Sequence, residues 1–117
     1  MRLRSDIWVL AYMRRCDSRG SPAFLLRRGA SDAGAIFIRI DRPNGTAALF
    51  GPAPQFHVTD LASDIDRAFT RAHSEEWVDS KDIDRRLARE VDFDPDLWIV
   101  CVEDPMGRSW LDPSELR

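Results

Sequence analysis

The chain has little of the residues that build extracellular, membrane-spanning or metal-binding domains. It holds only two cysteines and two histidines among 117 residues. Cys16 and Cys101 provide no disulfide framework, so we expect a reducing compartment, the cytoplasm. No apolar run approaches the roughly eighteen residues of a membrane span. The apolar run 7–13 is followed by Arg14-Arg15 without the cleavage pattern of a signal peptide. We therefore expect no membrane partner.

The scarcity of histidine also limits catalysis. Neither His57 nor His73 has a Cys or His neighbour at metal-ligand spacing. A nucleophilic enzyme would need one of them as its base, and no flanking sequence forms a nucleophile elbow. A small hydrolase-type enzyme with a histidine base therefore stays an alternative to a non-catalytic domain, and we lean towards the latter.

Two motifs that resemble ligand sites lack essential residues. Gly29 and Gly34 have the spacing of a phosphate-binding loop, but Ala35-Ile36 stand where Lys-Ser/Thr is required. The acidic residues between Asp92 and Glu103 match calcium-loop spacing, but the obligatory glycine is absent and Pro95 interrupts them. We predict no metal and no cofactor.

Charge is divided unevenly along the chain, which has a net charge of −3. Residues 1–58 hold nine arginines and four acids, a net +5, whereas residues 59–117 hold eight basic and sixteen acidic residues, a net −8. This asymmetry predicts a basic and an acidic face that could steer charged partners or align copies of the protein. Two solvated faces without a partner remain the alternative.

The pattern of apolar residues predicts a single α+β domain over residues 1–117. One helix is expected from Ser5 or Asp6 to about Asp17 and another from Ser80 to about Val91. Strands are expected at 23–27, 34–40, 46–50 and 97–102, with a turn at 42–45 and the last strand central. Residues 59–73 fit either a helix or a loop followed by a strand.

The segment between the first two strands is the candidate binding site. It carries Arg27, Arg28, Asp32 and Gly34, and we expect Arg14, Arg15 and Arg39 nearby. Guanidinium groups suit carboxylate or phosphate recognition, and glycines let backbone N–H groups approach a ligand. The alternative is that the glycines only form the turn and Asp32 caps it.

An arginine patch also raises nucleic-acid binding as an alternative. The patch would consist of Arg14, Arg15, Arg19, Arg27 and Arg28, with Trp8 or Tyr12 as stacking residues. Against this, the sequence pI is about 5.3 and Lys81 is the only lysine.

Six short segments carry a resemblance to a known family: Ser5-Asp6-Ile7-Trp8-Val9, Arg27-Arg28-Gly29, Asp32-Ala33-Gly34-Ala35, Asn44-Gly45-Thr46, Asp66-Arg67-Ala68-Phe69 and Phe93-Asp94-Pro95-Asp96-Leu97-Trp98. Through them the whole chain resembles an alphaproteobacterial family known as domain of unknown function 1491. The resemblance implies a cytosolic bacterial protein and an extended conformation for residues 65–72, but no activity and no catalytic residues. Leu61-Ala62-Ser63 upstream keep the helical alternative open.

Together these observations predict a two-layer sandwich of element order α-β-β-β-β-α-β. Its mainly antiparallel sheet of about five strands is expected to carry both helices on one face. The predicted function is a non-catalytic binding or regulatory module. Its expected partner is another protein or a small anionic ligand, and a homodimer is possible.

Overall fold

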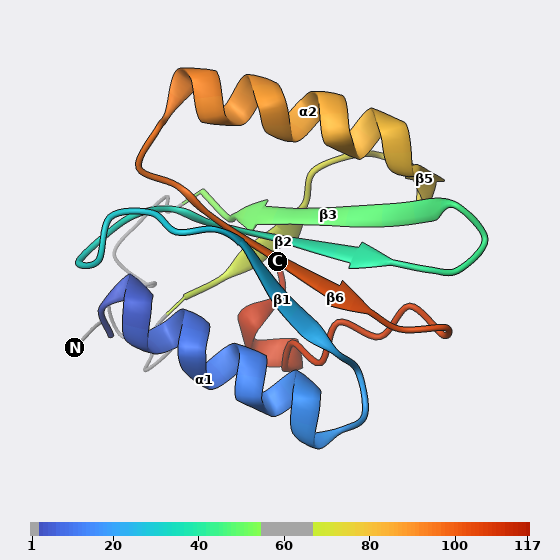
Figure 1. Ribbon diagram of the computed structural model, residues 1–117, viewed down its shortest axis with the longest axis horizontal. Coiled ribbons are helices and arrows are strands. Elements are labelled where there is room, and N and C mark those ends of the chain that lie inside the picture. The colour runs from blue at the N-terminus through green and yellow to red at the C-terminus, as the bar shows by residue number, and fades with distance from the viewer. Residues whose placement is uncertain (1–2, 55–66) are drawn as a thin grey trace.

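The chain folds around one mixed sheet, shown in the computed structural model of Figure 1. The structure describes residues 3–54 and 67–117. Its elements in chain order are α1 (Ser5–Ser18), β1 (Ala23–Arg27), β2 (Ile36–Asp41), β3 (Thr46–Pro52), β4 (Phe69–Arg71), β5 (Val78–Asp79), α2 (Ser80–Phe93), β6 (Trp98–Glu103) and the short 3-10 helix η2 (Pro113–Glu115). The α+β class and the order of the main elements are confirmed.

The sheet has the strand order β1-β6-β2-β3-β4, with β5 pairing on β3. Every pair of named strands is antiparallel except β2 with β6, which run parallel with Asp41 opposite Glu103. The predicted central strand is confirmed, since β6 lies between β1 and β2 and is buried along all but its last residue. A continuous apolar run gives this result because both faces of such a strand must be covered.

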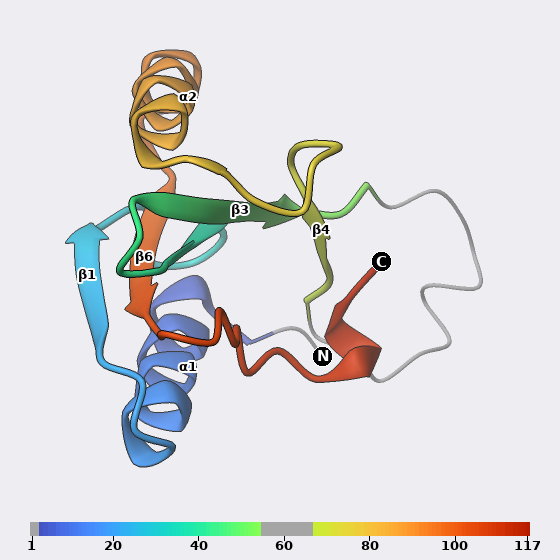
Figure 2. The same cartoon turned by 90° about the vertical axis from the view of Figure 1, so that its right-hand side faces the viewer.

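The two helices cover opposite faces of the sheet, which corrects the prediction that both lie on one face. Figure 2 shows α2 on one side of the sheet and α1 on the other. Ile36, Ile38 and Ile40 pack with α1, whereas Phe37 packs with Ile83 of α2. The physical reason is that β2 and β6 are buried on both faces, so one layer of helices could not cover them.

The structure also tests the predicted turn at 42–45 and part of the ambiguous segment 59–73. Gly45 has φ +84°, as the predicted turn between β2 and β3 requires. Phe69–Arg71 forms strand β4, which confirms the extended reading of that part of the ambiguous segment. His57 and residues 59–66 of the segment 59–73 lie outside the described residues.

A polar cluster fastens the C-terminal tail beneath α1. Asp104 is 1% exposed and accepts hydrogen bonds from Arg108 and from the Ser21 hydroxyl. Trp110 donates from Nε1 to Ser21 Oγ at 2.8 Å, and the guanidinium carbons of Arg19 and Arg108 each lie 5.0 Å from the centre of its ring. Trp110 also packs against the core and so anchors the tail.

Candidate functional site

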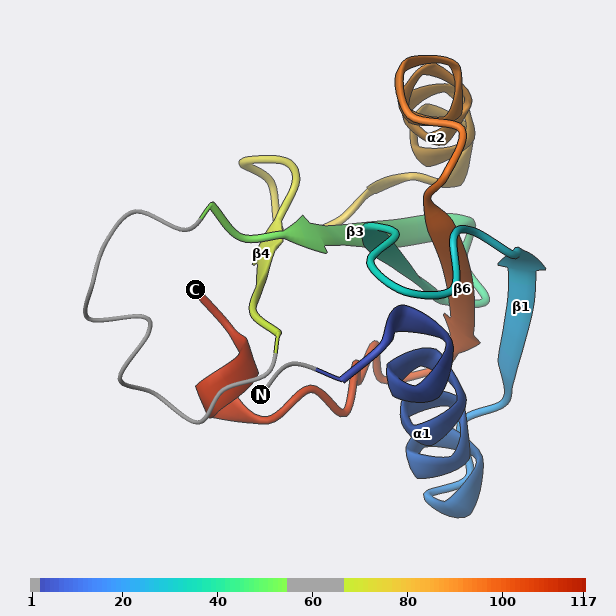
Figure 3. The same ribbon diagram turned by 90° about the vertical axis from the view of Figure 1, so that its left-hand side faces the viewer.

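Strand β1 forms one margin of the sheet, as Figures 2 and 3 show. Within the described residues it pairs with β6 alone, so its other side carries backbone groups open to a partner. Phe24, Leu25 and Leu26 are 46%, 39% and 55% exposed. We call these three residues and their outer backbone the β1 edge. Natural edge strands usually carry charges or proline that prevent pairing, and the centre of β1 carries neither.

A bulge between Leu25 and Arg27 sets which face of the sheet each predicted arginine occupies. Leu25 pairs with Val100, whose side chain packs with α1, whereas Arg27 pairs with Ile99, whose side chain packs with α2. Arg28 lines the groove on the α1 side. Successive side chains alternate between the faces of a strand, so the two neighbouring arginines lie on opposite faces. The extra residue of the bulge places Arg27 on the α2 side instead of the α1 side.

On the α1 side, a groove of about 270 Å³ runs between α1 and β1. We call it the α1 groove. The Arg28 guanidinium carbon lies 5.4 Å from the centre of the Trp98 ring at its wall, within the range of a cation–π contact. The apolar side chains that line it are Ile7, Val9, Leu10, Met13 and Leu25. It is therefore an apolar groove with Arg28 and the Asp6 carboxylate at its rim.

On the α2 side, a shallower groove of about 450 Å³ holds Arg27, which we call the α2 groove. Arg27 Nη2 donates to the Pro95 carbonyl at 2.8 Å. Leu26, Leu87 and Val91 supply apolar surface next to it. Asp84 and Asp92 also line this groove, so the β1 edge is flanked on each face by apolar surface, one arginine and at least one carboxylate.

Two other predicted arginines serve the fold. Arg39 is 7% exposed and lies between the carboxylates of Asp41 and Asp84. Burial opposes its charge, but the hydrogen bonds that Arg39 donates to the two carboxylates prevail, and the pKa of Arg39 is raised. Arg15 donates to Glu115 Oε1 at 2.7 Å and to the Trp110 carbonyl. Neither belongs to the surface around β1.

The remaining predicted residues divide between exposure and packing. Arg14 is exposed on α1, one turn beyond Leu10. The Asp32 carboxylate is 83% exposed and lies 3.5 Å from Arg4 Nε. Gly34 is buried, and a Cβ there would lie 2.4 Å from the Asp96 carbonyl oxygen.

The glycines of the loop are explained by close backbone packing. A Cβ on Gly29 would lie 2.2 Å from the Asp96 carbonyl oxygen, closer than real Cβ atoms approach. The amides of Ala30 and Gly34 already donate to the carbonyls of Asp96 and Ala30, so they do not form an open anion-binding nest.

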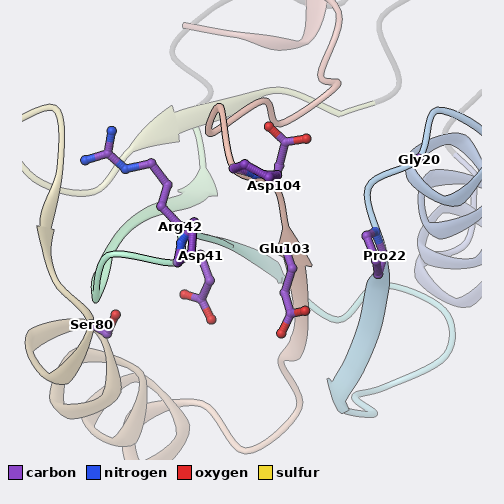
Figure 4. Close-up of a pocket in the computed structure, with 9 residues that line it drawn as sticks. Gly20, Pro22, Asp41, Arg42, Ser80, Glu103 and Asp104 are labelled. Atoms are coloured by element: carbon purple, nitrogen blue, oxygen red, sulfur yellow. The ribbon is translucent and has the colours of Figure 1, made fainter.

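A third concave surface, which the sequence did not suggest, lies at the carboxyl ends of the parallel strands. Figure 4 shows Asp41 and Glu103 pointing to one side of it and Asp104 to the other. We call this cleft of about 550 Å³ the acidic cleft; Pro22, Arg42 and Ser80 also line it. Open sheets often bind ligands at such strand ends. The sequence signal was two strands that each end in an acid, but only their pairing brings Asp41 and Glu103 together.

Groups suited to catalysis are held in structural roles where the structure describes them. Leu49 N–H donates to His73 Nε2 at 3.0 Å, and Nδ1 lies 2.7 Å from the Glu75 carbonyl, so both ring nitrogens are occupied. Burial raises the pKa of the Cys16 thiol, and burial together with Asp41 raises that of Cys101 to about 12. Over residues 3–54 and 67–117, no group of three His, Cys, Asp or Glu side chains is placed to hold a metal ion.

The stacking residues of the predicted nucleic-acid patch are buried. Trp8 and Tyr12 are 4% and 0% exposed and stack on each other with ring centres 5.1 Å apart. Arg15 is paired with Glu115. In the part of the chain described, no helix is long and apolar enough to cross a membrane.

These features define a small α+β domain with an open apolar edge. The model of the family described as "Protein of unknown function (DUF1491)" matches residues 3–112, and the chain belongs to this family. The predicted resemblance is therefore confirmed. No curated protein matches the chain.

Solved structures of relatives have the same fold. A crystal structure of a DUF1491 family protein from Caulobacter crescentus is 32% identical, with a TM-score of 0.78 over 100% of this chain and 99% of that one. An NMR structure of a DUF1491 family protein from the same organism is 33% identical, with a TM-score of 0.78 over 100% and 98% of the two chains. Protein Atu0922 from A. tumefaciens is 37% identical, with a TM-score of 0.73 over 89% and 87%.

Proposed function

We propose that the protein is a non-catalytic protein-binding module whose binding surface is the β1 edge and the α1 groove. The observation that carries the proposal is the exposure of three successive large apolar residues on a strand with one open side. Exposed apolar surface of this kind marks interaction sites. An added strand gains main-chain hydrogen bonds, and its alternate side chains reach the grooves on either face.

The arginines define the charge of the expected partner. Arg27 and Arg28 lie at the carboxyl end of β1, one on each face, and Arg14 is exposed on α1. Guanidinium groups at the rim of an apolar surface favour acidic flanks and disfavour basic ones. The partner is therefore an extended apolar segment with a carboxylate close to it in space.

A binding role fits this geometry better than the alternatives. The described histidine is fixed by two backbone contacts, and both thiols are buried with raised pKa values. Arg15 is paired, and the aromatic residues expected to stack on bases lie in the core. The surface around β1 is apolar at its centre, unlike a nucleic-acid surface, which depends on dense positive charge.

A photoreactive phenylalanine analogue tests the proposal. Placed at Phe24 and activated in cells, it should crosslink to a discrete polypeptide within an extended apolar segment. The matched control is the same analogue at Arg89, which is exposed on α2. Arg27→Glu combined with Arg28→Glu should reduce the Phe24 crosslink severalfold. Equal crosslinks from both positions, or none from Phe24, would contradict the proposal.

A further inference from the structure

We propose that the segment that pairs with the β1 edge is β1 of a second copy of this chain. The two strands run antiparallel about a twofold axis at Leu25 and join the two sheets into one. This inference rests on the proposed function and names the partner of that same surface. A twofold contact needs a surface that is complementary to itself, and β1 meets this condition in its backbone, apolar residues and charges.

The outward backbone groups of β1 suit a twofold at Leu25. The Pro22 carbonyl accepts from Glu103 N–H of β6, while Ala23 N–H donates to Asp17 Oδ1 instead of to the sheet. Because backbone directions alternate along a strand, the N–H and C=O of Leu25 also point away from β6. Two copies of Leu25 facing each other can therefore exchange both hydrogen bonds, as an antiparallel pair centred on one residue requires.

The apolar side chains match in the same register. With the axis at Leu25, Phe24 of each copy lies opposite Leu26 of the other on neighbouring strands, and the two Leu25 side chains meet on the α1 side. Leu25 also lines the α1 groove together with Ile7 and Leu10, which are 49% and 54% exposed. The grooves of the two copies therefore join across the axis, and exposed residues of α1 extend the contact beyond the strands.

Charge selects the antiparallel arrangement. Arg27 lies at the carboxyl end of β1, and Glu103 lies beside Pro22 at the amino end. Pairing about a twofold places the basic end of each copy beside the acidic end of the other. Arg27 and Glu103 also lie on the same face of the sheet, since Arg27 pairs with Ile99 and Glu103 lies four residues further along β6.

The acidic cleft supports this pairing. Asp104 is already matched by Arg108 and Asp41 by Arg39, whereas the exposed Glu103 forms no ion pair with any described residue. Pro22 and Glu103 line the cleft, so Arg27 of the second copy arrives at its rim. The second copy thus supplies a positive charge that pairs with Glu103.

Sedimentation equilibrium of the full chain with a charge exchange tests the inference. The wild type is expected to dimerise, and Arg27→Glu or Glu103→Arg alone should weaken the dimer about tenfold, because each places like charges together at both ends. A mixture of the two variants should restore a heterodimer, since one end then pairs Glu with Arg and the other keeps the native pair. Circular dichroism confirms that both variants remain folded.

The outcomes separate this inference from the proposed function. A wild type that stays monomeric from micromolar to near-millimolar concentration, or a mixture that is no tighter than each variant alone, overturns the inference. If the chain is monomeric while Phe24 still crosslinks to a different polypeptide, the proposed function stands and its partner is not a second copy. If the chain is monomeric and Phe24 crosslinks to nothing, both fail.

Discussion

The two edge strands of the sheet, β4 and β1, differ in what lies along their outer sides. At the β4 margin the C-terminal tail runs alongside the strand: Leu116 forms a parallel bridge with Phe69, and Arg117 N–H donates to the Phe69 carbonyl at 2.8 Å. At the β1 margin, within the described residues, nothing is paired with the strand, and its apolar side chains face outward. Edge strands are usually protected because they template association. Within the described residues, the tail therefore protects the β4 margin, whereas the β1 margin stays available for pairing.

The largest effect is expected from loosening the cluster that holds the tail. Asp104→Asn removes the charge that Arg108 and Ser21 contact inside a buried site, and we expect a loss of about 3 kcal/mol in the free energy of unfolding. Urea denaturation measures it. The matched control, Asp92→Asn at an exposed position, should change stability by less than about 0.5 kcal/mol. Equal losses would show that the cluster does not stabilise the tail.

The Asp104 carboxylate also makes the free energy of unfolding depend on pH. Burial opposes its charge, but the hydrogen bonds from Arg108 and Ser21 outweigh burial, and the pKa of Asp104 lies below the ordinary aspartate value of 3.8. A depressed pKa contributes stability that is present above the unfolded value and is lost as pH falls towards the folded value. The difference between wild type and Asp104→Asn should therefore be constant near neutral pH and shrink below about pH 4.

A smaller loss of stability is expected from changing Glu115, which also holds the C-terminal tail in place. Glu115 accepts from Arg15 and also from the Asp112 N–H. Glu115→Gln keeps the shape but removes the charge, so we expect a loss of about 1 kcal/mol in urea denaturation. Hydrogen exchange should speed up at Arg117 N–H and not at the amides of β1. Faster exchange in β1 would show that the two margins are coupled.

The smallest effect on stability is expected at the open margin. Leu26→Lys replaces a side chain that is 55% exposed, so the free energy of unfolding should change by less than about 0.5 kcal/mol. Light scattering should nevertheless show weaker self-association, because a lysine on an edge strand opposes pairing. Phe93→Lys, at a residue 89% exposed beyond the sheet, is the control and should leave self-association unchanged.

Local signals predicted most of the elements. The bounds of β1 follow from a short apolar run between Pro22 and Gly29, and the β2–β3 hairpin follows from its Pro-Asn-Gly turn. The unbroken apolar run of β6 predicted its central place in the sheet. Because that run needs packing on both faces, it also indicated one helix on each face of the sheet. The sequence of α1 did not show which of its sides faces the sheet, since it lacks a clean polar stripe.

The site was harder to predict because it depends on contacts between segments that are far apart in the sequence. The apolar residues of β1 look the same in sequence whether they fill a core or an interface. The bulge that decides which face of the sheet Arg27 occupies arises from pairing with β6, about seventy residues further along the chain. Likewise, the acidic cleft exists only once Asp41 and Glu103 have become neighbours.

The separation of β1 and β6 along the chain has a consequence for synthesis on the ribosome. Strand β1 ends at Arg27, whereas β6, its only partner in the described sheet, begins at Trp98. At about 5–20 residues per second, Phe24, Leu25 and Leu26 wait several seconds with both sides of their strand unpaired. The nascent chain therefore offers chaperones an apolar segment during that interval, and polysomes bring neighbouring copies of it close together while it is exposed.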